Sequence, residues 1–439
     1  MNNSGLRHVG GRALGLLVIL LALASGASAG WKEKVLYSFQ GIPDGQYPEN
    51  GVVFDNHGNL YGTTTYGGSD SCPGITPCGI VFQLQPGNSW TETVLYTFLG
   101  RDYNDGQTPA GGLIFDKAGN LYGTTAYGGS GTCTLLGTRP GCGTVFELSP
   151  PTGTGGAWTE TVLYSFQGGN DGDFPQGDLA FDKAGNLYGA TAFGGGYGSC
   201  NEYYPYCGTV FELSPPKTKG RAWTEQVLHA FTGGAGGAYP NGGLVLDRQG
   251  AVYGTAAIGG SGCGTLFKLV AEDGTWSEEV LHSFTDGADG SEPNGGLIFD
   301  AKGRLYGTTG AGGAAGHGLV YRLAPGRPWD ETVLYNFTGG DDGKNPLAGV
   351  TFGSAGSLSG TTAYGGGGSG NAFRLKPPGG KGGAWNCTDL HGFTGPPDGE
   401  FPTARVIFDT AGNLYSTTRV GGTGTCNGGG CGTVFEVSP

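Results

Sequence analysis

The sequence predicts an all-β fold, a seven-bladed β-propeller with four strands in each blade. Three observations predict it: one pattern occurs seven times, each copy holds four apolar runs of β-type residues, and glycine-rich turns separate these runs. Seven tryptophans, 53 to 68 residues apart, mark the copies, which start near residues 31, 90, 158, 223, 276, 329 and 385. Copies of this length with four strands apiece are typical of propeller blades.

The copy that covers residues 111–166 shows the expected strands. From the axis outwards they are 111–116 (GGLIFD), 120–127 (NLYGTTAY), 143–148 (GTVFEL) and 160–166 (ETVLYSF). A hairpin turn joins the first two, and a glycine-rich loop bracketed by cysteines joins the second to the third. An acidic Asp-Gly-x-x-Pro turn leads from the last strand to the next copy. Because strand direction alternates, the cysteine loops and the acidic turns meet at one end of the ring, which we call the loop face.

The two ends of the repeat array predict how the ring closes. The last copy stops after its third strand, at residues 432–437, whereas residues 33–39 have the sequence of an outermost strand. We expect these two segments to pair and to complete the seventh blade, because pairing removes an exposed sheet edge and ties down the termini.

Residues 1–29 are predicted to be a signal peptide, and residues 30–439 a single propeller domain. The first segment has a basic start, an apolar run at 14–24 too short to span a bilayer, and an Ala-Ser-Ala motif at 27–29. The chain is therefore expected to be secreted, to an extracellular or periplasmic location, with no membrane insertion after cleavage. Its net charge of −13 argues against nucleic acid as a partner. A monomer is expected.

Ten cysteines fit an oxidising compartment. Eight of them bracket the same loop in four copies, and we expect four disulfides: Cys72 with Cys78, Cys133 with Cys142, Cys200 with Cys207, and Cys426 with Cys431. Cys263 and Cys387 are left over and are expected to be buried free thiols.

The motif GNLYGTTAYGG, followed by GTVFELSP and then VLYSF, resembles the GloVer tandem repeat of "choice-of-anchor" exported bacterial proteins. The resemblance covers essentially all of residues 30–439 and implies a secreted β-propeller. It implies no activity, cofactor or site residue. The core LIFDxxGNLYGTT is also similar to the NHL-type propeller repeat, which supports the same strand order.

The loop face is the expected binding surface. Aromatic rings stack on the apolar faces of sugars, and carboxylates accept hydrogen bonds from sugar hydroxyls. The candidate ligand-binding aromatics end the second strand of four copies: Tyr66, Tyr127, Phe193 and Tyr364. The candidate aspartates belong to the acidic turns: Asp44, Asp105, Asp171, Asp289, Asp342 and Asp398. The competing interpretation is that the aromatics pack under their own Gly-Gly loops and the aspartates only shape their turns.

No metal site or cofactor is expected. Extra acids beside the acidic turns would allow weak calcium binding, but none of these turns has the spacing of an EF-hand loop. His229, His282 and His391 take the place of a tyrosine in the outermost strand, where a half-buried amphipathic side chain explains them better than a metal does.

We interpret the protein as a binding or interaction module, for extracellular carbohydrate or a surface protein. One alternative is a carbohydrate lyase, a hydrolase or a lactonase on a propeller fold, and another is a purely structural envelope protein. An enzyme needs a unique cluster of catalytic groups near the central channel. The polar residues of this sequence instead recur from copy to copy, so no catalytic residue is assigned.

Overall fold

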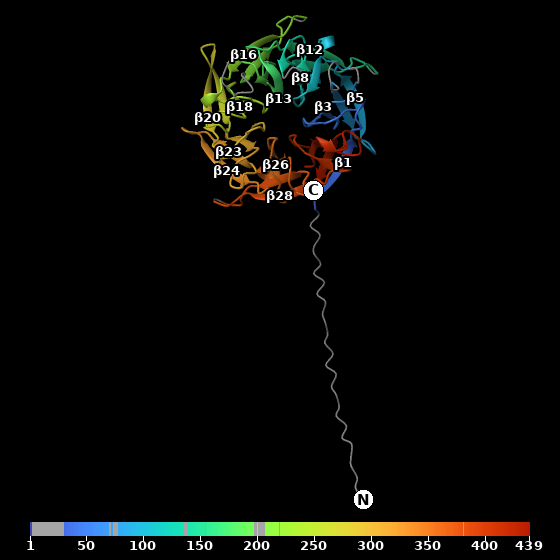
Figure 1. Ribbon diagram of the computed structural model, residues 1–439, viewed down its shortest axis with the longest axis vertical. Coiled ribbons are helices and arrows are strands. Elements are labelled where there is room, and N and C mark those ends of the chain that lie inside the picture. The colour runs from blue at the N-terminus through green and yellow to red at the C-terminus, as the bar shows by residue number, and fades with distance from the viewer. Residues whose placement is uncertain are drawn as a thin grey trace. The chain divides into compact units, whose positions relative to one another are not determined.

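The computed structural model describes Met1 and most of residues 30–439. The described residues from Trp31 onwards form a ring of seven blades (Figure 1). The predicted signal peptide, Met1 apart, lies outside the described residues. The described parts are residues 1, 30–69, 72, 78–135, 139–153, 155–196, 200, 207–218, 220–380 and 382–439. The prediction of a seven-bladed all-β propeller is confirmed.

Each blade is an antiparallel sheet of four strands, which follow one another from the axis outwards. The first three blades are β2 (Val53–Phe54), β3 (Leu60–Thr64), β4 (Ile80–Gln85) and β5 (Thr91–Thr97); β7 (Ile114–Phe115), β8 (Leu121–Gly128), β11 (Thr144–Ser149) and β12 (Thr159–Ser165); and β13 (Asp173–Phe181), β14 (Leu187–Phe193), β15 (Thr209–Ser214) and β16 (Thr224–Ala230). The next two are β17 (Val245–Leu246), β18 (Val252–Ala256), β19 (Thr265–Glu272) and β20 (Thr275–Ser283); and β21 (Ile298–Phe299), β22 (Leu305–Thr309), β23 (Leu319–Ala324) and β24 (Asp330–Asn336).

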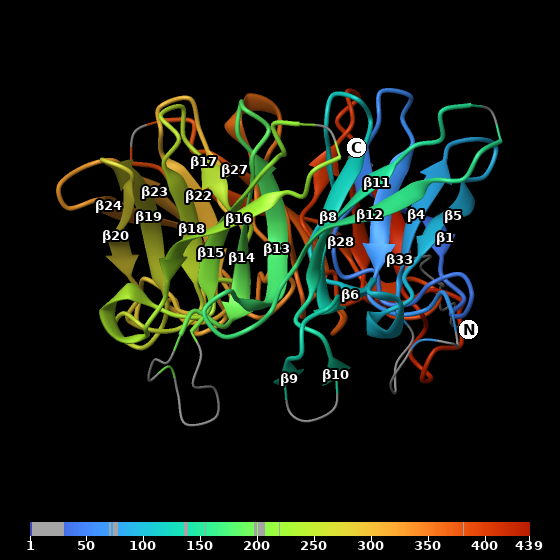
Figure 2. The same cartoon turned by 90° about the horizontal axis from the view of Figure 1, so that it is seen from above.

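The sixth and seventh blades follow the same order, and a few short elements decorate the loops. The sixth is β25 (Thr351–Phe352), β26 (Leu358–Thr362), β27 (Asn371–Lys376) and β28 (Asn386–Gly392), and the seventh is β30 (Ile407–Phe408), β31 (Leu414–Thr418), β33 (Thr433–Ser438) and β1 (Lys32–Ser38). The short elements are β6 (Gly106–Pro109), β9 (Thr134–Leu135), β10 (Arg139–Pro140), β29 (Gly399–Glu400), β32 (Val420–Gly421) and the 3-10 turns η1 (Arg101–Tyr103), η2 (Gly234–Gly236) and η3 (Ser354–Gly356). Figure 2 shows the ring from the side, with the loop face at the bottom.

The ring closes as predicted. Strand β1 pairs with β33 in antiparallel register, with Lys32 opposite Ser438 and Val35 opposite Phe435. The seventh blade therefore contains both ends of the repeat array.

The blades are held together by aromatic packing that repeats at every junction. A phenylalanine just after the outer strand of one blade meets an aromatic ring in the third strand of the next, edge to face or tilted, with centroids 4.9–5.4 Å apart. Phe98 and Phe146 are one such pair, and both are fully buried. Second strands are buried along most or all of their length, because neighbouring blades cover both faces of each sheet.

In six of the seven blades the innermost strand is shorter than the sequence predicted. In the third blade, β13 (Asp173–Phe181) is continuous, with an irregular register between Gln176 and Ala180. Only Ile114 and Phe115 of the expected strand 111–116 pair with β8, and the preceding β6 pairs with the other end of β8. Residues 110–113 leave the sheet between these two segments and border the central channel. We call this segment the inner bulge, and every blade has its counterpart after the proline of the acidic turn. Glycine-rich sequence favours a bulge over continuous pairing.

The backbone immediately before the bulge explains its shape. In all seven blades the residue before the proline has a positive φ, between 55° and 61°, although none is glycine: Tyr47, Thr108, Phe174, Tyr239, Glu292, Asn345 and Phe401. This conformation is costly for such residues. In each case the N–H donates a hydrogen bond of 2.9–3.1 Å to a carbonyl of the preceding blade's cysteine loop, so the strained residue fastens one blade to the next.

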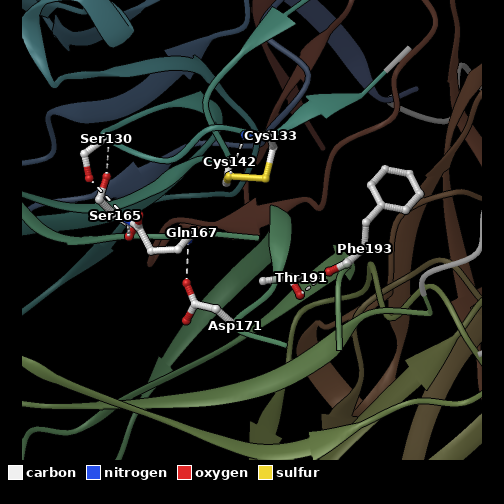
Figure 3. Close-up of a disulfide and its surroundings, with 8 residues drawn as sticks. All are labelled: Ser130, Cys133, Cys142, Ser165, Gln167, Asp171, Thr191 and Phe193. Carbon is white, nitrogen blue, oxygen red and sulfur yellow. Dashed lines mark hydrogen bonds between the residues drawn. A yellow bond between two sulfur atoms is a disulfide. The ribbon is translucent and has the colours of Figure 1, made fainter. Parts of the chain in front are cut away.

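The four predicted disulfides are present. Figure 3 shows the one between Cys133 and Cys142. The second cysteine of each pair supplies the carbonyl that receives the N–H from the next blade, so the disulfides stiffen the acceptor side of four blade junctions. Cys263 and Cys387 are free and partly buried. No helix in the described part of the chain has the length and hydropathy to cross a membrane.

Candidate functional site

The inner bulges surround a cavity of about 630 Å³ at the loop-face end of the central channel. All seven blades contribute to its wall, mainly through the three residues that follow each proline. A second hollow, of about 540 Å³, is lined by inner-strand side chains nearer the other end, among them Phe181, Leu246, Phe299 and Phe352. Arg405 borders both spaces. The second hollow is the more apolar of the two spaces, and Arg405 lies between them.

Aromatic side chains gather on one side of the cavity. Tyr127 and Phe174 line it, with ring centroids 4.9 Å apart. The row continues from Phe174 to Phe193 at 5.5 Å and from Phe193 to Tyr239 at 5.4 Å. We call these four residues the aromatic arc, and it spans the second, third and fourth blades. Three of its rings, Phe174, Phe193 and Tyr239, are half-buried, and of these Phe174 lines the cavity.

The opposite side of the mouth is charged. Arg419 forms an ion pair with Glu49 at 2.5 Å, and its guanidinium lies 5.5 Å from the centre of the Tyr47 ring. Tyr47 in turn contacts Tyr66, with centroids 5.8 Å apart. Both members of the ion pair line the cavity, as does Tyr66. A ligand at this mouth would meet apolar rings on one side and hydrogen-bonding charges on the other.

The predicted aromatics do not form one uniform ring. Tyr66 and Tyr127 line the cavity, and Phe193 lies in the aromatic arc. Tyr364 lies elsewhere, 41% exposed, against Phe401 and with the Lys344 ammonium 5.8 Å from its ring centre. The sequence analysis missed Phe174 and Tyr239, which precede the proline of the acidic turn. Aromatic residues at that position in four copies were the signal that could have revealed them.

The side chains of the predicted aspartates contact the backbone of their own turns and a side chain of the outer strand. Asp171 accepts hydrogen bonds from the Tyr164 hydroxyl at 2.7 Å and from the Gln167 N–H at 2.5 Å, and Figure 3 shows it apart from the Phe193 ring. The other five make the same backbone contact, and each also meets the tyrosine or histidine of the outer strand: Asp44, Asp105, Asp289, Asp342 and Asp398. These contacts support the turn-forming interpretation of the aspartates.

The sequence analysis did not predict the carboxyl groups that meet at the blade junctions, a glutamate of the outer strand and an aspartate of the preceding acidic turn. The outer strand of six blades carries a glutamate whose Oε1 is buried and has no hydrogen-bond partner among the described residues: Glu33, Glu92, Glu160, Glu225, Glu278 and Glu331. Burial, and then the nearby Asp105 of the preceding turn, raises the pKa of Glu160 to about 8. Burial likewise raises the pKa of the other five to about 7.

The three outer-strand histidines lie at the same junctions. His391 Nε2 is 3.0 Å from Asp398, and together with Glu33 these groups offer ligand atoms within 4.8 Å of one another. His282 lies 3.3 Å from Asp289, and His229 lies 3.6 Å from Glu278, which occupies the space left by Gly236. Direct hydrogen bonding between His391 and Asp398 raises the pKa of the histidine and lowers that of the aspartate. We interpret these groups as junction contacts equivalent to the tyrosine–aspartate contact of other blades.

The third residue after each proline, which we call the waist position, lines the cavity in all seven blades. It is glycine in five blades, and Asp178 and Arg405 in the third and seventh: Gly51, Gly112, Asp178, Gly243, Gly296, Gly349 and Arg405. A Cβ at Gly349 would overlap the carbonyl oxygen of Gly296, and one at Gly51 would lie 2.8 Å from the carbonyl oxygen of Arg405. Glycine therefore lets the bulges approach each other, and two blades add a charge to the waist.

The chemistry of the cavity suits recognition of a polar ligand. Its described lining contains two carboxylates, both engaged: Glu49 with Arg419, and Asp178 with the Gly112 N–H at 2.9 Å. Amide and hydroxyl side chains from Gln176, Asn241 and neighbouring blades complete the wall. None of the described lining residues is a histidine or a cysteine.

We compared the chain with known protein families and solved structures, and the matches are consistent with a repeat protein that folds as a β-propeller. The sequence model of the Gloeobacter/Verrucomicrobia repeat matches residues 27–261, 131–373 and 245–439. No protein of curated function matches the sequence. Among solved structures, a fungal alcohol oxidase of the AA5 family in complex with copper is 14% identical, with a TM-score of 0.51 over 93% of this chain and 76% of that chain. A Bacteroides uniformis protein assigned as a 6-phosphogluconolactonase is 14% identical, with a TM-score of 0.48 over 80% and 85%. Similarity at this identity is evidence for the fold alone.

Proposed function

Because this chain belongs to the Gloeobacter/Verrucomicrobia repeat family and closes into a propeller with a central cavity, we propose that it is a secreted module that binds extracellular carbohydrate at its loop face. The proposal depends chiefly on one observation, the aromatic arc that leads from the cavity across three blades. Aromatic faces stack on the C–H faces of pyranose rings and gain most where water is excluded.

The polar wall of the cavity supports the same proposal. Asn241 donates a hydrogen bond of 3.0 Å to Asn294, and its own buried Oδ1 has no donor among the described residues. Asn241 and Asn294 both line the cavity, and amide side chains can exchange hydrogen bonds with sugar hydroxyls. The cavity volume lies within the range of small-molecule sites. Sugar hydroxyls would thus find donors and acceptors beside the stacking surface.

Export is supported by the four disulfides, which persist in oxidising compartments. N-terminal sequencing of the protein recovered from the medium or periplasm of an expressing cell tests this part. We expect the recovered chain to begin at Gly30, and recovery from the cytosol with residues 1–29 attached would contradict export.

Carbohydrate binding is tested by calorimetric titration of the exported protein with ligands found on a glycan array. We expect Phe174→Ala to weaken binding about three- to tenfold, because it removes the central ring of the aromatic arc. Tyr103→Ala is the matched control, since Tyr103 is a 63% exposed aromatic that does not line the cavity. We expect a chelator to have no effect, because the turn aspartates already accept protein hydrogen bonds. Absence of binding to every glycan would contradict the proposal and favour a protein partner.

A further inference from the structure

We propose that the waist of the channel is a carboxylate subsite centred on Arg405, and that the ligand is therefore an acidic saccharide, such as one containing a uronic acid. This inference rests on the proposed function, because the aromatic arc and the waist are parts of one cavity. It adds the chemical class of the ligand and a residue that selects it.

Arg405 extends towards the two blades that precede its own in the chain. It belongs to the seventh blade, and its guanidinium lies over the waist glycines of the fifth and sixth. A Cβ at Gly296 would overlap Arg405 Nη2, and a Cβ at Gly349 would lie 3.2 Å from the same atom. The missing side chains at these two glycines make the room that the guanidinium occupies. The arrangement therefore directs a fixed cation towards the axis.

The guanidinium of Arg405 has no direct partner within the described part of the chain. No carboxylate forms an ion pair with it and no acceptor forms a hydrogen bond with it, whereas Arg419, Arg304 and Arg322 all have such a partner. The group is half-buried between the two halves of the channel. A cation in such a place is unfavourable unless an anion joins it. The protein as a whole is acidic, so this lone cation is the more conspicuous.

The waist also offers backbone donors that a carboxylate can use. The Gly112 N–H donates to the carboxylate of Asp178 at 2.9 Å, which shows that a carboxylate fits against a waist glycine. The equivalent N–H groups of Gly296 and Gly349, the two glycines beside Arg405, have no hydrogen-bond acceptor among the described residues. A second carboxylate placed there would meet Arg405 and the unused N–H groups together.

The shape of the guanidinium favours a carboxylate. Its planar fork can donate two parallel hydrogen bonds to the two oxygens of one carboxylate, which gives both energy and direction. A uronic acid presents this group on a pyranose ring, and the ring would lie towards the aromatic arc. A neutral sugar would leave the cation unpaired.

The test compares an acidic saccharide with its neutral counterpart, for example a disaccharide that ends in glucuronate and one that ends in glucose. Calorimetric titration of the exported protein should give at least about tenfold tighter binding of the acidic ligand, the gain expected for one charge-assisted contact. Arg405→Gln should abolish this preference, so that the acidic and the neutral ligand bind equally well. Arg405→Lys should restore only part of the preference, because lysine keeps the charge but lacks the fork.

Two controls make the outcomes distinct. Phe174→Ala should weaken both ligands by the same factor, because it acts on the stacking surface. The melting temperature of Arg405→Gln should be no lower than that of the parent, which separates a binding role from a structural one. Equal binding of both saccharides by the parent protein would overturn the carboxylate subsite and leave the proposed function intact. Binding of neither saccharide would overturn the carboxylate subsite, and absence of binding to every glycan on the array would overturn the proposed function as well. A preference that survives Arg405→Gln would overturn the role of Arg405.

Discussion

Two regions of the molecule are built from the same repeat: the blade junctions at the outer strands, which we call the rim, and the waist of the channel. The seven copies have nearly the same residue types at the rim, but they differ at the waist. At the rim, six outer strands place a glutamate at the junction with the preceding blade, and in five of these the acidic turn supplies an aspartate that faces it. At the waist, five copies have glycine, one has Asp178 and one has Arg405. The comparison teaches that regular chemistry holds the ring together, whereas the departures from the repeat make the wall of the central cavity asymmetric.

The largest effect is expected at the waist. Gly349→Ala should lower the free energy of unfolding by about 3 kcal/mol, because the new Cβ overlaps the Gly296 carbonyl and neither backbone can yield. Gly379→Ala is the matched control, with no heavy atom within 4 Å of the new Cβ, and should change stability by less than about 0.5 kcal/mol. Denaturant unfolding followed by tryptophan fluorescence measures both. Equal stability of the two variants would mean that the bulges are not packed at the waist.

An intermediate effect is expected at the rim, as a dependence of stability on pH. Glutamates whose pKa is raised from 4.5 to about 7 or 8 bind protons more tightly in the folded state than in the unfolded chain. Their contribution is therefore most favourable below pH 4.5 and is lost as the pH rises through 7 to 8. Burial lowers the pKa of His229 and His282, so these two groups favour folding more at high pH than at low pH. The pKa of His391 is raised, so this group, like the glutamates, favours folding more at low pH. We expect the melting temperature to be higher at pH 5 than at pH 8.

One substitution isolates the rim effect. Glu160 faces Asp105 of the preceding turn and the Tyr96 hydroxyl of the preceding outer strand. Glu160→Gln should raise the melting temperature at pH 8 by about 2 °C and leave it unchanged at pH 5, because it removes the ionisation that the site disfavours. Glu272→Gln, at an exposed position of β19, should have no effect at either pH. A rise of equal size at both pH values would show that proton binding is not the cause.

The smallest effect concerns the one junction where a cysteine replaces the glutamate. Burial, and then the charge of Asp342, raises the pKa of the Cys387 thiol to about 12. At pH 8 only about one molecule in ten thousand would carry the thiolate, which is the reactive form. We expect a thiol reagent to modify Cys387 in denaturant but not in the folded protein, as measured by mass spectrometry of peptides. Rapid modification of the folded protein would contradict a buried junction at this blade.

The repeat predicted much of the fold because its signals are local. Apolar runs, glycine-rich turns and paired cysteines each lie within one copy, and seven copies agree. Closure of the ring was predictable from the surplus strand before the first copy and the missing strand in the last. The innermost strand of the second blade was predicted too long, because residues 111–116 have the residue types of an uninterrupted β-strand. Its interruption depends on a strained residue before the proline and on contacts with the neighbouring blade, which a single copy does not reveal.

The candidate site was harder to predict because it is assembled between copies. Tyr66, Tyr127 and Phe193 were found from their recurrence, but Phe174 and Tyr239 join them only through the backbone turn that precedes each proline. Arg405 departs from the repeat, so a search for recurring residues passes over it. The same search favoured the turn aspartates, whose recurrence is explained by their hydrogen bonds within the turn.

The pairing of β1 with β33 sets an order on folding. Residues near position 35 must wait for residues near position 435 before their backbone hydrogen bonds can form. A contact across 400 positions of chain closes slowly, because the ends of a long segment must first meet. Six blades can assemble while synthesis continues, but the seventh sheet needs the final strand. Until then β1 has an unpaired edge, and the cell that makes this chain must keep that edge from joining another molecule.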